Sequence, residues 1–321
     1  MKRIFFIILS ALLLVFSLSF CEGIMKFELD LINIPFPPYQ RNVTKLFEAP
    51  NGLTYGIIPS SLLCSGKIFY LDRDTRIHQI QRLPDDVLQV DSIIFNPDIA
   101  WTWDKTFRKI ITIDKSGTLV VYDKNGPGKE ILKIAGTRPY EVQGFQISQA
   151  FAQDAKGNLF TAGKDGTIFK INPETLQIEK LQTRLPSIKG REPWASLDAA
   201  ATGDDGTIYL GTYDGYIAAF NPDTNVIINL GKPLRQQRIQ ALVFFNGIVF
   251  GIGGESDGLA RWFVYDPSTR SFHLGGTLKN SENRLIYEPV NTMIVTKKGE
   301  IIGSFSGRLG SLFVIKTGKE K

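Results

Sequence analysis

The sequence is poor in the residues from which many enzymes build reactive or metal-binding centres. It contains only two histidines and two cysteines. His78 and His273 both fall in segments expected to be outer strands, so we expect neither to act as a base or as a zinc ligand. If the N-terminal segment is removed near Cys21, Cys64 alone remains and no disulfide framework can form. We therefore predict neither a metal site nor a cofactor.

The sequence also lacks a concentrated block of positive charge. Its formal net charge is +5, and removal of Lys2 and Arg3 with a leader would take away two of those charges. The one basic run, KTGKEK at Lys316–Lys321, is typical of a solvated chain end. Because no Lys/Arg cluster alternates with aromatic residues, we expect no nucleic-acid partner.

One long hydrophobic run is present, and it lies at the N-terminus. A short basic start precedes the apolar run Ile4–Phe16, and small residues follow before Cys21. This order is typical of a signal peptide, so residues 1–23 are predicted to be a leader and residues 24–321 one exported domain, secreted or extracytoplasmic, without membrane insertion after cleavage. A lipid anchor at Cys21 and an uncleaved membrane anchor are the alternatives, and the run is short for the latter.

A repeat organises the middle of the sequence. Gly117, Gly166 and Gly215 lie 49 residues apart, and the segments around them align without a gap. The aligned segments are AWTWDKTFRKIITIDKSGTLVVYD (100–123), QAFAQDAKGNLFTAGKDGTIFKIN (149–172) and DAAATGDDGTIYLGTYDGYIAAFN (198–221). Short β-branched and aromatic runs alternate there with Asp-Gly and Lys-Gly turns, whose glycines supply positive φ. Each unit is predicted to be a meander of about four strands.

Looser copies on both sides bring the number of units to six. They cover Gly52–Leu83, Ala241–Gly275 and Asn291–Lys316, and the last copy stops after its third strand. The alternating segment Lys26–Ile34 supplies a candidate for the missing strand. We predict an all-β fold, a six-bladed β-propeller of four-stranded antiparallel blades closed by an N-terminal strand, with seven blades as the alternative. A linear solenoid is disfavoured because the end units lack polar caps.

The phrases DGTIYLGTYDGYIAAFNPDT, VVYDKN and FVYDPSTRSFHLG resemble the secreted bacterial β-propeller superfamily. That superfamily includes streptogramin-lyase-like, quinoprotein-like and polysaccharide-utilisation propellers, and the resemblance spans Lys45–Lys316. Its motifs build strands and turns, so it implies a fold and leaves the function open. A quinone-dependent sugar dehydrogenase is disfavoured, because the resemblance implies a histidine base and a calcium site on one face of such a propeller, and neither histidine is placed for that role.

The connectors between predicted blades repeat one combination of side chains. Propellers bind ligands mainly where these connectors, together with the loops between second and third strands, surround the channel mouth. The connectors supply Arg138, Arg191, Arg238 and Arg284, the glutamates Glu141, Glu192 and Glu288, and the aromatic residues Tyr140, Trp194 and Tyr287. The inter-strand loops add Tyr213, Asp214, Glu255, Arg261, Trp262 and Arg308.

This combination has two interpretations. Guanidinium groups pair with carboxylates, and aromatic faces stack on sugars, so an acidic saccharide is a ligand that would use both. Alternatively, each arginine pairs with a glutamate of its own or the next connector, and the resulting ring of ion pairs fixes how the blades pack.

Two functions follow from the first interpretation. One is an exported, non-catalytic propeller that binds a glycan, a peptide or another envelope protein on its connector face. The other is a lyase or hydrolase acting on a uronate-containing polysaccharide, in which a tyrosine is the acid/base and arginines neutralise the carboxylate. The tyrosines available are Tyr140, Tyr213 and Tyr287, and the neutralising residues are Arg138, Arg191 and Arg284.

Overall fold

The computed structural model consists of β-strands joined by turns. The residues that it describes are 27–38, 41–43, 45–48, 53–58, 67–72, 74–82, 100–103, 109–113, 118–123, 129–133, 150–163, 165–172, 177–190, 196–235, 238–254, 259–306 and 310–317. No α-helix occurs among these residues, and consequently none of them belongs to a helix that would cross a membrane.

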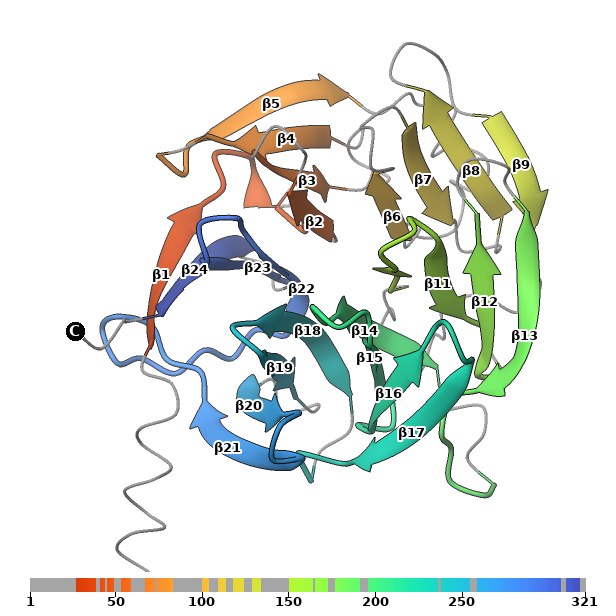
Figure 1. The fold of residues 1–321 in the computed structure, drawn as a ribbon. Helices are drawn as coiled ribbons and strands as arrows, with labels where there is room; N and C mark the ends of the chain where they lie inside the picture. Colours follow the sequence, from red (N-terminus) through yellow and green to blue (C-terminus); the bar gives the residue numbers. More distant parts are fainter. Residues whose placement is uncertain are drawn as a thin grey trace, which may run out of the picture.

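The strands form four-stranded antiparallel sheets arranged around a common centre (Figure 1). Three sheets come from residues 45–184. They are β2 (Lys45–Glu48), β3 (Thr54–Ile58), β4 (Lys67–Leu71) and β5 (Ile77–Arg82); β6 (Ala100–Trp103), β7 (Lys109–Ile113), β8 (Thr118–Asp123) and β9 (Lys129–Lys133); and β10 (Ala152–Gln153), β11 (Leu159–Ala162), β12 (Thr167–Ile171) and β13 (Ile178–Arg184).

Three further sheets come from residues 197–317, and β1 near the N-terminus completes the last of them. They are β14 (Leu197–Thr202), β15 (Ile208–Thr212), β16 (Ile217–Asn221) and β17 (Val226–Gly231); β18 (Ile239–Phe245), β19 (Ile248–Gly253), β20 (Arg261–Asp266) and β21 (Ser271–Thr277); and β22 (Val290–Val295), β23 (Ile301–Phe305), β24 (Ser311–Thr317) and β1 (Phe27–Asn33). The first strands β14, β18, β22 and β2 contact one another in turn around the centre. The prediction of an all-β propeller is therefore confirmed.

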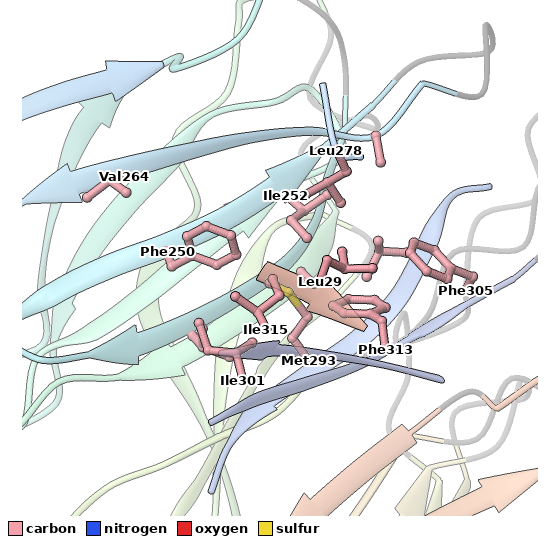
Figure 2. Packing of buried hydrophobic residues seen from close by; sticks show 14 residues of the cluster. Leu29, Phe250, Ile252, Val264, Leu278, Met293, Ile301, Phe305, Phe313 and Ile315 are labelled. Atoms are coloured by element: carbon pink, nitrogen blue, oxygen red, sulfur yellow. The ribbon is translucent and has the colours of Figure 1, made fainter. Parts of the chain in front are cut away.

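Strand β1 is the outermost strand of the last sheet. It pairs antiparallel with β24 from Phe27 opposite Thr317 to Asn33 opposite Ser311. Figure 2 shows its residue Leu29 among side chains of the core between this sheet and the β18–β21 sheet. Leu29 is 1% exposed, whereas Leu31, two residues further along the same strand, is 48% exposed. The alternation of the sequence therefore directs one face of β1 into the core.

Three sheets contain the same cross-strand pair of a glycine and a phenylalanine. The pairs are Gly56 with Phe69, Gly251 with Phe263, and Gly303 with Phe313. A methyl group on any of these glycines would come within 2.3 Å of the phenylalanine Cζ. The fully buried ring thus occupies the space above the glycine, which explains why glycine stands in the middle of a second strand, where it is otherwise unfavourable.

The predicted Asp-Gly turns are confirmed. In the β14–β15 hairpin, Asp205 accepts hydrogen bonds from the backbone N–H of Thr207 at 2.9 Å and from its hydroxyl at 2.9 Å. Gly206 between them has φ +83°, the left-handed region that glycine adopts without strain. Asp165 and Thr167 make the same pair of bonds in the preceding sheet. The aspartates therefore shape turns.

The alternation of β1 generates a prediction about its docking. Leu29→Ala should lower the free energy of unfolding by about 2–5 kcal/mol, because it leaves a cavity between two sheets. Leu31→Ala is the matched control and should change it by no more than about 0.5 kcal/mol. Urea denaturation followed by circular dichroism measures both, and equal effects would contradict the docking of β1 through its Leu29 face.

Candidate binding site at the propeller axis

The first strands of three successive sheets carry a β-bulge at the same place. The pairing register skips one residue at Asp198 in β14, at Gln240 in β18 and at Asn291 in β22, in each case the second residue of the strand. A bulge changes the direction of its side chain relative to a regular strand. These three side chains, which we call the axial residues, therefore share one structural position.

The axial residues line a common cavity together with Lys45, the first residue of β2. The cavity has a volume of about 170 Å³ and lies between β2, β14, β18, β22 and the residues Ala150 and Phe151 just before β10. Most of its lining residues lie in the first half of the innermost strands. The cavity therefore lies toward the end of the axis at which the blade connectors run.

Each axial residue is hydrogen-bonded to the segment that leads into the next sheet. The bonds are Arg238 Nε to Asp198 Oδ2 at 2.8 Å, Val290 N to Gln240 Oε1 at 2.8 Å, and Asn291 Nδ2 to Val43 O at 3.0 Å. The donors and acceptors come from neighbouring sheets, which share no backbone ladder. We call these bonds the axial latch, because they join one blade to the next.

The ion pair between Asp198 and Arg238 is the charged part of the axial latch. The side chains are 1% and 18% exposed, respectively. Burial raises the pKa of Asp198, and the charges of Arg238 and Lys45 oppose that rise. The other carboxylate oxygen, Oδ1, is buried and has no hydrogen-bond partner within the part of the chain that the structure describes. Such an oxygen is unfavourable unless a donor reaches it.

Lys45 is the second charged group of the cavity lining. Desolvation lowers its pKa to about 8, although the nearby Asp198 carboxylate opposes this shift. Among the described residues, no carboxylate lies within ion-pair distance of its ammonium group. Ionisable groups perturbed by burial within a cavity are typical of functional sites.

Of the predicted site residues, Arg238, Tyr213 and Asp214 lie together. The backbone N–H of Arg238 donates to the carbonyl of Tyr213 at 2.7 Å, so the connector before β18 docks on the turn between β15 and β16. Tyr213 and Asp214 are both buried. Burial raises the pKa of Tyr213, which is the opposite of what a tyrosine base requires.

The connector from β21 to β22 carries Arg284 away from the axis, whereas Glu288 is half-buried two residues before β22. Its exposed Arg284 forms an ion pair with Glu282 of the same connector, with 3.2 Å between Nε and Oε2. The backbone N–H of Ser281, also in this connector, donates a hydrogen bond to the carbonyl of Leu29 in the outermost strand β1 at 3.2 Å. Tyr287 is 62% exposed. This connector therefore does not bring Arg284 to the innermost strands where Arg238 lies.

Arg261 and Trp262 are the first two residues of β20. The Trp262 indole stacks on Phe250 with 5.8 Å between ring centroids. It also covers Gly275, where a methyl group would lie 1.8 Å from the indole Cε2. The indole of Trp262 is therefore held by packing within its own sheet.

Other predictions fall outside the described residues, and they stay predictions. They concern the leader 1–23 and the site residues Arg138, Tyr140, Glu141, Arg191, Glu192, Trp194, Glu255 and Arg308. His78 and His273 are described, and they lie on the outermost strands β5 and β21, as predicted. Within the described ranges, no group of three or more His, Cys, Asp or Glu residues is placed to hold a metal ion.

Solved structures with a similar fold are β-propellers. The chain is similar to a streptogramin B lyase (12% identity, 91% of this chain, 98% of that chain, TM-score 0.61) and to virginiamycin B lyase from Staphylococcus aureus (10%, 91%, 99%, 0.57). It is also similar to the WD40 repeats of RRP9 (11%, 91%, 98%, 0.54). No protein-family model and no curated protein matches the sequence. At these identities the likeness shows the fold alone, so the chain is a β-propeller.

The axial latch generates a stability prediction. Arg238→Met should lower the free energy of unfolding by about 3–5 kcal/mol, because it leaves the buried Asp198 carboxylate without its cation. Asp198→Asn in the same background should recover part of that loss. The matched control is Arg284→Met, which should leave the urea denaturation midpoint nearly unchanged, since its ion pair is exposed. Equal midpoint shifts for the two arginine variants would contradict the latch.

Proposed function

We propose that the protein is an exported, non-catalytic β-propeller of six blades, closed by β1, that binds its ligand at the axial cavity of the connector face. Six four-stranded sheets and the pairing of β1 with β24 support the blade count and the closure. The leader-like residues 1–23 support export. The ligand class that we favour is a glycan, with a peptide or an envelope protein as the alternatives.

The observation that carries this proposal is the pair of charged groups in the cavity. Lys45 and Asp198 come from sheets that are not neighbours in sequence, and both line a space of about 170 Å³. Folding alone would favour apolar groups here, because removing an ammonium and a carboxylate from water costs free energy that incomplete pairing does not return. Arg238 pairs with Asp198, and a ligand that pairs with the ammonium of Lys45 would account for the presence of that lysine.

A second candidate function is elimination on a uronate-containing polysaccharide. The observation that favours it is the lowered pKa of Lys45, about 8, because a lysine with such a pKa supplies some neutral amine as a base near neutral pH. The raised pKa of Tyr213 argues against that tyrosine as the base, so Lys45 joins Tyr140 and Tyr287 as a candidate base.

Binding to an array of uronate-containing and neutral glycans tests the proposed function. The full-length protein should bind a subset of them saturably. Lys45→Met should weaken that binding by about tenfold or more, because it removes a charge-assisted hydrogen bond from a partly desolvated site. Lys279→Met, which removes an exposed lysine of the β21–β22 connector, should leave it unchanged. Absence of binding to glycans, peptides and envelope proteins alike would contradict the proposal.

The ultraviolet absorbance of unsaturated products separates binding from elimination. Incubation of the protein with the glycans that it binds should give no increase in absorbance if the protein is non-catalytic. A time-dependent increase that Lys45→Met abolishes would instead establish the lyase function.

A further inference from the structure

We propose that the protein forms a two-fold symmetric dimer in which the outermost strand β17 pairs antiparallel with β17 of a second copy. This inference goes beyond the proposed function, because it concerns the rim of the propeller and does not involve the axial cavity. Its basis is the edge of β17, which lies on the outside of its sheet with β16 as its one partner among the described strands (Figure 1).

The outermost strands of the sheets differ in charge. The sequences of β1, β5, β9 and β13 contain charged residues, whereas β17 (VIINLG) and β21 (SFHLGGT) contain no Asp, Glu, Lys or Arg. Charged residues on an edge strand oppose its pairing with another chain, because that pairing would remove them from water. The edge of β17 therefore lacks a common protection against pairing.

The strand β17 also exposes apolar side chains. Val226 is 53% exposed and Ile228 is 59% exposed, and because they stand two residues apart they lie on one face of the strand. Ile227 between them packs on the core cluster of the β10–β13 and β14–β17 sheets. The other uncharged outer strand, β21, exposes one large apolar residue, Leu274. Two neighbouring exposed apolar side chains on an uncharged edge are a surface on which a further strand can dock.

A second copy of β17 matches this surface. The ladder between β16 and β17 is regular from Val226 to Asn229 and shifts register after it. Antiparallel pairing of this regular stretch about a two-fold axis at Ile227 places Val226 of each copy opposite Ile228 of the other. Both exposed side chains are then covered by their counterparts, and β-branched residues suit such cross-strand pairs.

The charges beside β17 favour the same arrangement. Asp223 stands three residues before the strand, and the exposed Lys232 directly follows it. Antiparallel pairing brings Asp223 of each copy next to Lys232 of the other, whereas parallel pairing would bring like charges together. Asp223 forms an ion pair with Lys156 at 2.6 Å, but its side chain is 71% exposed and can also approach a second cation.

Pairing with a second copy also closes the assembly. Among the outer strands whose side chains are described, no other combines an uncharged sequence with two exposed large apolar residues. A two-fold dimer uses this edge of both copies, so no such edge is left for open-ended association.

Sedimentation analysis of the full-length protein tests this inference. The protein should be dimeric at about 100 µM. Ile228→Lys should raise the dissociation constant of the dimer by about tenfold or more, because it puts a charge on each of the two paired edges. Leu274→Lys, which makes the same change on the exposed face of β21, is the matched control and should leave that constant unchanged. Urea denaturation verifies that each variant is folded.

Three outcomes of this experiment would overturn the inference. The first is a monomer at all concentrations up to about 100 µM. The second is an association that Ile228→Lys does not weaken, since the dimer would then use another surface. The third is a series of species larger than a dimer, because pairing through β17 alone stops at two copies.

Reversal of the flanking charges tests the orientation of the two strands. Lys232→Glu should raise the dissociation constant by about threefold or more, because it places two carboxylates together at each end of the paired strands. Asp223→Lys in the same chain should restore the affinity, since opposite charges then meet again. Failure of the second substitution to restore it would overturn the antiparallel pairing.

Discussion

Near the axis, the blades are held together by the hydrogen bonds of the axial latch. Each of these bonds joins an axial residue to the segment that enters the next sheet. Neighbouring sheets share no backbone ladder, so they are joined by apolar packing and by such side-chain bonds. The Asp198–Arg238 ion pair is the charged member of this set, and Gln240 and Asn291 make its neutral counterparts. A buried carboxylate in this role is tolerated only because its cation stays in place.

The same bulges place polar groups around the axial cavity. A regular strand would alternate its side chains between the two faces of a blade, whereas a bulge at the second residue redirects one side chain. Three such side chains and Lys45 therefore meet at the beginning of the innermost strands. The ammonium of Lys45 is not used by the latch, so joining the blades leaves one charged group of the cavity lining outside these bonds.

Much of the fold was predictable from local sequence signals, whereas the site was not. The 49-residue spacing of Gly117, Gly166 and Gly215 and the Asp-Gly turns specify strands and hairpins, which depend on nearby residues. Arg238 was recognised as a connector arginine, but its partner Asp198 belongs to another blade. Lys45 carries no local signal, because its desolvation and its closeness to Asp198 arise only when β2 meets the other first strands. The one sequence signal for the axial residues was that Asp198, Gln240 and Asn291 each stand second in the first strand of a sheet.

The pKa of Lys45 is the most direct test of a desolvated, charged site at the axis. Selective isotope labelling of lysine and NMR titration of the full-length protein measure it, and Lys45→Met assigns the signal. We expect a pKa of about 8, well below the ordinary value of 10.5. A pKa at the ordinary value would show that Lys45 is a solvated surface residue, and it would contradict the proposed site.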